Sequence, residues 1–461
     1  MKEKRGSFSG RLGFVLAAAG SAVGLGNLWR FPYLAAKDGG GVFLLVYILL
    51  TLTFGFALLT NEIALGRKTR MSAIRAYEKI DKRFGFLGIL TAIVPLLIFP
   101  YYCVIGGWVS KYSMDFIIGN GMETVADSYF TGFITSFWPP IIWMGIFMGI
   151  TALVVVFGVE KGIEKFSKVL MPALVIIVIG IAIFALTLSD AESGRSAIDG
   201  LKIYVMPDFT GMTVGKFFNV LLDAMGQIFF SMSIAMGIMI TYGSYAKSDT
   251  DLVKSVNHIE IFDTGVAILA GLIMIPTVYT FQGSEGLNAA GPGLLFVSMP
   301  KIFAEMGAIG HIVGILFFIL VLFAALTSSI SILEAVVSMI MDKFGYSRKR
   351  SIVIALIIAV ILALVTCFGY NIWYFEYTLP NGSVAQILDI FDYVINSFLM
   401  PIIAMLTCVF VGWVCGTKLI TDEIKLNGEK FGREPLYIVM IKVVAPVCLV
   451  LILLSAFGVF N

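Results

Sequence analysis

Charged residues are scarce in this sequence. Lysine, arginine, aspartate and glutamate make up 13% of the 461 residues, whereas 59% are hydrophobic and the mean hydropathy is +0.96. Soluble domains carry about 25% charged residues, so this scarcity excludes a soluble chain. It predicts a polytopic membrane protein without a separate soluble domain. The formal net charge of +2 gives no reason to expect a nucleic-acid partner.

Cysteine and histidine are scarce as well. Five cysteines lie singly in apolar segments without a CxxC pair, and only His258 and His311 accompany them. This pattern predicts structural thiols and no Cys/His metal centre. No nucleophile with a base and no phosphate loop stands out, so we do not expect an enzyme. The opening MKEKRGSFSGR lacks the short apolar core of a signal peptide, and the first apolar run should remain as a span.

Long apolar runs are what the sequence has in abundance. A run of about 20 residues crosses a bilayer core, and eleven runs reach that length. They lie at residues 11–36, 41–66, 87–117, 139–157, 166–188, 217–245, 256–282, 309–341, 351–370, 386–416 and 435–459. The sequence therefore predicts an all-α protein with eleven transmembrane helices.

The basic residues orient these spans. If the N-terminus is cytoplasmic, the inside loops carry 24 of the 32 lysines and arginines. The positive-inside rule then predicts a multi-pass protein of the cell membrane with a cytoplasmic N-terminus. Because eleven is odd, the C-terminus is expected outside the cell. Segments 118–138, 189–215 and 283–308 become outer loops long enough to form lids.

The first span contains the glycine-rich stretch GSAVGLGNLWRFP. Gly20, Gly24 and Gly26 each weaken a helix by about 1 kcal/mol relative to alanine. Unwound backbone at membrane depth is tolerated where it lines a cavity or is buried in protein; close helix packing through GxxxG is the alternative explanation. Asn27 and Arg30, a polar amide and a cation beside the break, favour a binding cavity.

The sixth span has a second interruption, with Ser231, Ser233 and Gly237 at its centre. Spans 1 and 6 then hold matching positions in two halves of five spans, residues 11–188 and 217–416. Since five is odd, the halves are inverted in the membrane. The helix at 435–459 is extra to the repeats, and residues 1–461 form one transmembrane domain. Paired broken helices in inverted repeats predict a transporter with its site at the midplane.

Three motifs resemble the signatures of the neurotransmitter:sodium symporters: RLGFVLAAAGSAVGLGNLWRFPY, GQIFFSMS and FAALTSSISI. The resemblance covers nearly the whole chain and is closest to the eleven-span bacterial amino acid transporters of that family. It implies the LeuT fold, with a 5+5 inverted repeat and broken helices 1 and 6. It also implies sodium-driven uptake by alternating access.

The resemblance implies two sodium ions. The first set of ligands is Ala22, Asn27, Ser231 and the substrate carboxylate, with Asp263 as a direct ligand or a near neighbour. The second set is Gly20, Val23, Ala324, Thr327 and Ser328. All of these ligands are oxygen atoms, which suit a hard monovalent ion. Without the resemblance, the TSS triplet at 327–329 would more simply bond to the preceding helical turn.

Asp263 supplies a carboxylate near the first sodium site. Relatives that need chloride hold an anion there, so the resemblance implies that chloride is not required here. Ala267, one turn on, offers no hydroxyl to an anion. The alternative is that Asp263 belongs to a structural polar network.

The implied substrate pocket combines helix-end backbone, hydroxyl groups and apolar side chains. Its residues are Ser21, Ala22, Gly24, Gly26, Ile98, Tyr102, Phe230, Ser231, Ser233, Ala235, Met236 and Ile332. The polar groups suit an amino acid's carboxylate and ammonium, and the adaptable Met236 suits side chains of different size. We therefore expect import of hydrophobic L-amino acids. The alternatives are another small zwitterionic amine, an amino-acid sensor or receptor, and a channel.

Gates are implied by charge placement. The outer gate is Arg30, Asp392 and Gln227, and the inner gate is Arg5, Asp342 and Tyr245. Glu62 is expected to brace the broken helices through backbone amides. Gly162 and Pro172 resemble a place where span 5 unwinds during inward opening; a glycine loop with a proline in the first helical turn is the alternative. Glu334 and Asp223 receive no role.

Overall fold

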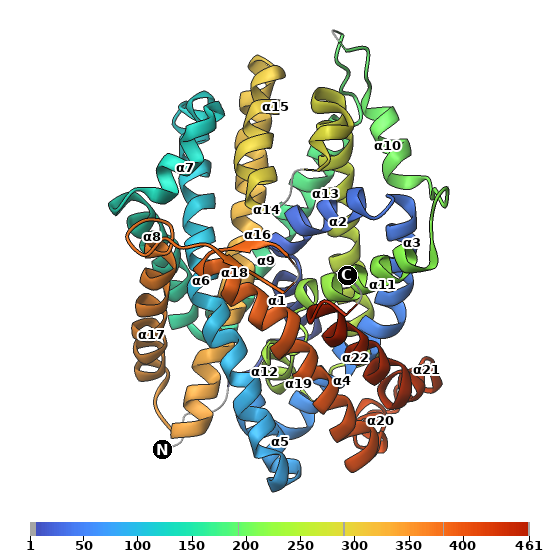
Figure 1. Cartoon of the computed structure of the whole chain (residues 1–461). Coiled ribbons are helices and arrows are strands. Elements are labelled where there is room, and N and C mark those ends of the chain that lie inside the picture. The colour runs from blue at the N-terminus through green and yellow to red at the C-terminus, as the bar shows by residue number, and fades with distance from the viewer. Residues whose placement is uncertain (1–5, 192, 289–290, 381, 460–461) are drawn as a thin grey trace.

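The computed structural model describes residues 6–191, 193–288, 291–380 and 382–459, and Figure 1 shows that this part of the chain is a bundle of helices. Within it, one small sheet pairs β1 (Tyr377–Thr378) with β2 (Val384–Ala385) antiparallel. The expected all-α architecture is confirmed.

Each expected span corresponds to one helix or to a helix broken into pieces. Spans 1 to 5 are α1 (Arg11–Ala22), η1 (Gly26–Arg30) and α2 (Phe31–Lys37); α3 (Gly41–Leu50), η2 (Thr51–Gly55) and α4 (Phe56–Thr69); α6 (Gly85–Ile117); α8 (Trp138–Val156); and η5 (Val159–Glu164) with α9 (Lys165–Ala185). Spans 6 to 9 are α11 (Val214–Ser231) with α12 (Ile238–Tyr245); α13 (Leu252–Gly286); α16 (Ala308–Phe344); and α17 (Arg348–Phe368). Span 10 is α18 (Ile387–Tyr393), η7 (Val394–Leu399), α19 (Met400–Val409) and η8 (Phe410–Val414), and span 11 is α21 (Glu434–Val439), η9 (Met440–Val444) and α22 (Ala445–Ala456).

Short helices connect these spans. They are α5 (Ala73–Ile80), η3 (Lys82–Phe84), η4 (Gly121–Val125), α7 (Asp127–Thr135), α10 (Ala197–Val205), α14 (Gly291–Gly293), η6 (Leu294–Ser298), α15 (Met299–Glu305) and α20 (Lys418–Ile424). In Figure 1, α7, α10 and α15 lie at the upper end, whereas α5 and α20 lie at the lower end. The long loops predicted to be lids are thus partly helical.

Nine helical stretches of the described chain are long and apolar enough to cross a membrane, and α1 with η1–α2, bent by 51°, makes a tenth. The one expected span that remains is span 6, which is broken into α11 and α12, with residues 232–237 between them. The number of spans is therefore compatible with eleven.

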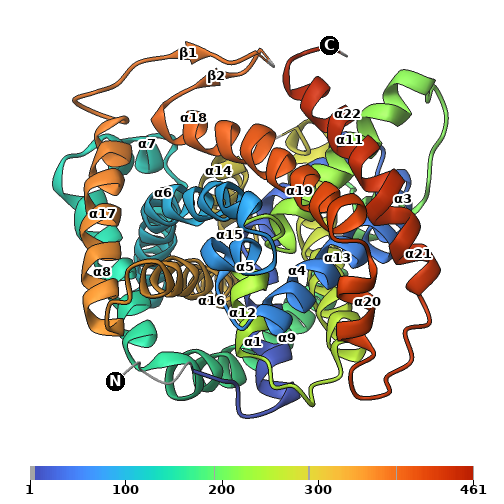
Figure 2. The same ribbon diagram turned by 90° about the horizontal axis from the view of Figure 1, so that it is seen from below.

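The helices pack around a buried centre. Seen from below in Figure 2, α8 and α17 lie along one edge, α3 and α21 lie toward the opposite edge, and α1, α12 and α16 lie between. Two glycines bring α4 against α12, because a Cβ atom at Gly66 or Gly243 would overlap the backbone of the other helix. Such small-residue contacts let membrane helices approach closely, and this one draws the second half of span 6 into the centre.

Candidate functional site

The break in the first span lies at residues 23–25, between α1 and η1. Val23 ends α1 with extended backbone (φ −75°, ψ 99°). The Asn27 side chain stabilises the break, because its Oδ1 accepts the Gly24 amide at 3.1 Å. Hydroxyl groups reach the carbonyls beside the break: Ser233 Oγ donates to Ser21 O at 3.1 Å, and Ser328 Oγ donates to the same oxygen at 3.2 Å. The polar groups of unwound backbone therefore meet side chains of spans 6 and 8.

The break in the sixth span carries unusual backbone. Ser233 and Ala235 have φ values of 54° and 62°, and Gly237 has 69°. Positive φ is costly for residues with a Cβ atom, so surrounding groups must hold this turn. One of them is Glu62, whose Oε1 accepts the Ala235 amide at 2.7 Å. Glu62 is expected to brace the broken helices through backbone amides, and this hydrogen bond is one such contact, to the break of span 6.

The two breaks enclose a small cavity between the broken helices, α6 and α16. It is lined by Ser21, Ala22, Gly24, Leu25, Gly26, Asn27, Ile98, Tyr102, Phe230, Ser231, Ser233, Met236, Ser328 and Ile332. Every residue predicted for the substrate pocket is in this set except Ala235, whose amide is bonded to Glu62. Leu25, Asn27 and Ser328 join the lining without having been predicted for it.

The cavity has a polar and an apolar part. Ser21 Oγ and Ser233 Oγ lie 3.1 Å apart, and the buried Tyr102 hydroxyl has no hydrogen-bond partner among the described residues. A Cβ atom at Gly24 would lie 3.4 Å from that hydroxyl, and one at Gly26 would overlap the Phe230 ring. The hydroxyl and the backbone of the break therefore face the same space, which only glycine leaves open. Ile98, Met236 and Ile332 form the apolar part.

Asp263 contacts two of the residues predicted for the first sodium site, Asn27 and Ser231. The third, Ala22, lies in the wall of the cavity. Asn27 Nδ2 donates to Asp263 Oδ1 at 2.8 Å, and Ser231 Oγ donates to Oδ2 at 3.2 Å. Asp263 and Asn27 are fully buried, and no cationic side chain of the described chain pairs with this carboxylate. A buried carboxylate without a counter-charge is costly. The carboxylate and hydroxyl oxygens of Asp263 and Ser231 therefore suit a hard cation, which would supply the missing counter-charge.

Tyr47 on α3 is a member of this cluster that the sequence did not reveal. Its hydroxyl donates to Asp263 Oδ2 at 3.3 Å and lies 3.1 Å from Ser231 Oγ. Tyr47 is surrounded in the sequence by apolar residues, and a buried tyrosine is common in such a span. Only the packing of α3 against α11 and α13 shows that its hydroxyl meets a carboxylate.

The second predicted sodium site lies where α16 meets the break of span 1. Ser328 Oγ is 3.4 Å from Val23 O, and a Cβ atom at Gly20 would lie 3.3 Å from Thr327 Cβ. Thr327 Oγ1 bonds to its own helix, at 3.1 Å from Ala324 O. The alternative explanation for the TSS triplet, a hydrogen bond to the preceding helical turn, therefore holds for Thr327, whereas the Ser328 hydroxyl contacts span 1. Gly20, Val23, Thr327 and Ser328 belong to this contact, whereas Ala324 is seen only as the acceptor of the Thr327 hydroxyl within α16.

The outer gate residues lie close together without an ion pair. Arg30 stacks over the Phe230 ring, with its Cζ 5.8 Å from the ring centroid, and no ion pair joins it to Asp392 in the described structure. Asp392 instead accepts from Tyr101, at 3.1 Å. Gln227 Nε2 donates to Gly26 O at 3.1 Å. A larger cavity of about 860 Å³ opens above Arg30.

The inner gate is partly visible. Arg5 lies outside the described residues. Asp342 accepts the backbone amide and the hydroxyl of Ser72, at 2.7 and 2.6 Å. Tyr245 donates to Glu334 Oε1 at 2.7 Å. Residue Phe8 is buried and its amide donates to Tyr245 O at 3.2 Å, so the segment before α1 packs against this end of span 6.

The two acids without an expected role, Glu334 and Asp223, and the expected unwinding site at Gly162 each have a definite structural setting. Glu334 forms a buried ion pair with Arg348, and Asp223 pairs with Lys37 at 2.7 Å. Gly162 lies inside the wound π-helical segment η5. Span 5 is therefore helical at the position expected to unwind.

A model of the sodium:neurotransmitter symporter family matches residues 5–120 and 139–461. An uncharacterized sodium-dependent transporter of Methanocaldococcus jannaschii is 33% identical, over 93% of this chain and 86% of the relative. The human sodium- and chloride-dependent taurine transporter is 26% identical, over 94% of this chain and 74% of its own. The crystal structure of MhsT in complex with L-phenylalanine superposes with a TM-score of 0.86 at 35% identity, over 98% of this chain and 100% of that one.

Proposed function

This chain belongs to the sodium:neurotransmitter symporter family, and we propose that it imports hydrophobic L-amino acids, both aliphatic and aromatic, together with sodium. The family and the fold make it a multi-pass, sodium-dependent symporter and not an enzyme. The observation that carries the substrate proposal is the composition of the central cavity, which has hydroxyls and helix-end backbone on one side and apolar side chains on the other.

An amino acid matches both parts of this cavity. Its carboxylate suits the Tyr102 hydroxyl and the backbone at the break of span 1, and its ammonium suits the Ser21 and Ser233 oxygens. Among the described residues, no acidic or basic side chain lines the cavity, so a charged side chain would be buried there without a partner. Ile98, Met236 and Ile332 offer contact to hydrocarbon. The L-phenylalanine bound to the structural relative MhsT supports this substrate class.

We further propose that two sodium ions bind, one at the Asp263 cluster and one between span 1 and α16. Asp263 supplies the negative charge at the first site, so chloride is not required. The basic loops support a cytoplasmic N-terminus and an extracellular C-terminus. In that orientation the 860 Å³ cavity above Arg30 faces the outside, where substrate would enter.

Competition binding tests the substrate class. Purified protein in sodium is given one labelled hydrophobic amino acid, and leucine, phenylalanine, tryptophan, taurine, creatine and glutamate compete. The proposal predicts displacement by the first three only, and loss of binding when potassium replaces sodium. Displacement by taurine or creatine alone would favour the other zwitterionic amines. Saturable binding without sodium-driven uptake into vesicles would favour a sensor.

A further inference from the structure

A connecting segment between spans 10 and 11 is fastened to the bundle by buried charges. We call residues 418–433 the strap: it comprises α20 and the loop that leads to α21. The strap lies at the lower end of the molecule in Figure 1, near α4. Connecting loops normally run over the surface with solvated polar groups, so buried ion pairs on such a segment call for a reason.

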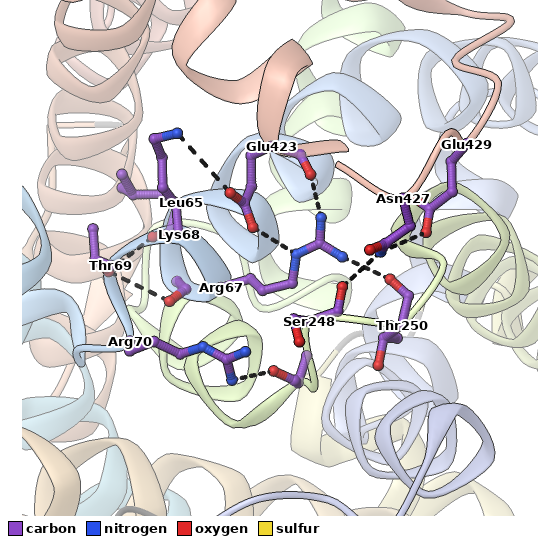
Figure 3. A network of polar contacts seen from close by, with 12 residues as sticks. Leu65, Arg67, Lys68, Thr69, Arg70, Ser248, Thr250, Glu423, Asn427 and Glu429 are labelled. Carbon is purple, nitrogen blue, oxygen red and sulfur yellow. Dashed lines mark hydrogen bonds and ion pairs between the residues drawn. The ribbon is translucent and has the colours of Figure 1, made fainter. Parts of the chain in front are cut away.

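The first attachment is the ion pair of Arg67 and Glu423, drawn in Figure 3. Arg67 is 2% exposed, and its Nε lies 2.7 Å from Glu423 Oε1. The same guanidinium donates from Nη1 to Thr250 O at 2.6 Å and from Nη2 to Glu423 O. One side chain of α4 therefore holds both the strap and the loop between α12 and α13.

The second attachment has the opposite polarity. Here the strap supplies the arginine: Arg433 Nη2 lies 2.8 Å from Glu260 Oε2 on α13, and Glu260 is 3% exposed. Arg433 Nη1 also donates to Leu52 O at 3.1 Å, and its Cζ lies 3.4 Å from the centroid of the Phe56 ring. The end of the strap is thus bound to α13 and to span 2.

A third contact lies between the attachments at Glu423 and Arg433. Asn427 Nδ2 donates to Ser248 O at 2.6 Å, and Figure 3 shows this contact beside Arg67. The strap therefore meets span 2, the α12–α13 loop and α13 through Glu423, Asn427 and Arg433. Breaking a buried pair strands a charge, so these contacts favour movement of the strap together with those helices.

The chain just before the strap is fastened elsewhere. Tyr77 of α5 lies 2.9 Å from Thr407 Oγ1 of α19, and its ring packs on Phe410 at 5.5 Å between centroids. At the start of α5, Ser72 is bonded to Asp342 of α16. Spans 10 and 8 are therefore joined through α5. Residues 415–417 connect this body to the strap, and Gly416 has a φ of +80°, which glycine adopts readily.

We propose that the strap is a conformational coupling element: it moves as one body with span 2, α12 and α13, residues 415–417 act as its hinge, and the reciprocal pairs Arg67–Glu423 and Arg433–Glu260 fix its register. Buried ionic groups are best known for such register roles.

Spin-label distances test this proposal without reference to the transported substrate. Labels are placed at Asp422 with Lys254, and at Asp422 with Lys82, which are exposed positions on α20, α13 and η3. The part-buried Cys415 and Cys448 are replaced by serine. Distances are compared in sodium and in potassium at equal ionic strength. We expect the 422–254 distance to stay constant while the 422–82 distance shifts by about 2 Å or more, the scale of segment rearrangements. A larger shift in 422–254, or none in either pair, would overturn the proposal.

Glu423→Gln then tests the ion pair itself, with Lys425→Gln as the matched control. Lys425 is on the same strap and pairs with Glu434 at a half-exposed position, 44% and 27% exposed. We expect Glu423→Gln to broaden the 422–254 distribution and Lys425→Gln to leave it unchanged. Identical distributions in the two variants contradict a register role. If Glu423→Gln does not yield folded protein, Glu260→Gln tests the second pair by the same distances.

Discussion

Asp263 is the residue on which the ion chemistry depends. Its buried carboxylate receives hydrogen bonds from Asn27, Ser231 and Tyr47 and has no cationic side chain as partner in the described chain. In the proposed account sodium is that partner. The carboxylate would then do what a bound chloride does in other members of the family, where chloride dependence is part of names such as that of the human taurine transporter.

Substitutions at this cluster should have graded effects. Asp263→Asn leaves sodium without its counter-charge, and losing one partner of a buried pair costs about 3 kcal/mol or more, roughly a 150-fold loss of sodium affinity. Tyr47→Phe removes one hydrogen bond to a charged group, about 1.5 kcal/mol or roughly tenfold. Sodium titration of labelled amino acid binding measures both.

Tyr101→Phe is the control for Tyr47→Phe, because it removes a buried tyrosine hydroxyl that bonds to a different acid, Asp392. It should leave sodium affinity within about twofold. An Asp263→Asn variant with the sodium affinity of the original chain would mean that Asp263 serves a structural network only.

Met236 should set the size of the substrate. Met236→Phe places a larger side chain in the apolar part of the cavity and leaves less room for substrate. Overpacking a filled site costs about 1–3 kcal/mol, roughly 5- to 150-fold in affinity. Tryptophan should lose more affinity than leucine, because leucine leaves room for the new ring. Competition of both amino acids against one labelled substrate measures the difference. Equal losses would show that Met236 does not face the side chain of the substrate.

At the scale of elements, the broken helices create the site. The break of span 1 needs Gly24, because a Cβ atom there would lie 2.7 Å from Ser328 Oγ. Gly24→Ala should therefore displace Ser328, at a cost of about 1–3 kcal/mol, and lower sodium-dependent binding about tenfold or more.

Gly265→Ala is the matched control in an unbroken helix, α13, where no described atom lies within 4 Å of the new Cβ. There the substitution should keep binding and stabilise the protein by about 0.5–1 kcal/mol, because alanine loses less backbone entropy in a helix. Thermal unfolding and binding separate the two variants. Equal behaviour would show that the break has no special need for glycine.

The elements that could be predicted from the sequence are those with a local signal. Apolar runs indicated the spans, and the glycines of residues 20–26 with Ser231, Ser233 and Gly237 indicated both breaks. Groups joined across long sequence separations could not be found in this way. Tyr47 meets Asp263 over 216 residues, and Arg67 meets Glu423 over 356. Such pairs depend on how helices pack against one another, and the periodicity of apolar residues within one helix does not show which helices will meet.

The π-helical segments were also missed. Residues 51–55, 394–399, 410–414 and 440–444 widen spans 2, 10 and 11, and their sequences share no pattern that marks them: 410–414 is FVGWV, whereas 440–444 contains Lys442. A π-bulge arises where a helix accommodates its neighbours. The outer gate gives a similar lesson: the placement of Arg30 and Asp392 in the sequence predicts a pair, whereas in the structure Arg30 lies over Phe230 and Asp392 accepts from Tyr101.

At the scale of the whole molecule, the two halves place one site between two sides of a membrane. Arg30 lines the large cavity of about 860 Å³, and near the N-terminal end of the described chain Phe8 is buried and its amide donates to Tyr245 O. In the proposed account the site communicates with one side of the membrane at a time. A channel would need a continuous path instead.

The central claim, sodium-coupled import of hydrophobic amino acids without chloride, is tested most directly by accumulation in proteoliposomes. Purified protein is reconstituted, an inward sodium gradient is applied, and labelled leucine uptake is followed with chloride or with gluconate as the anion. The account predicts accumulation above equilibrium that collapses when sodium is equal on both sides and that is nearly unchanged in gluconate. Uptake that ignores the sodium gradient, or that falls tenfold in gluconate, would contradict it.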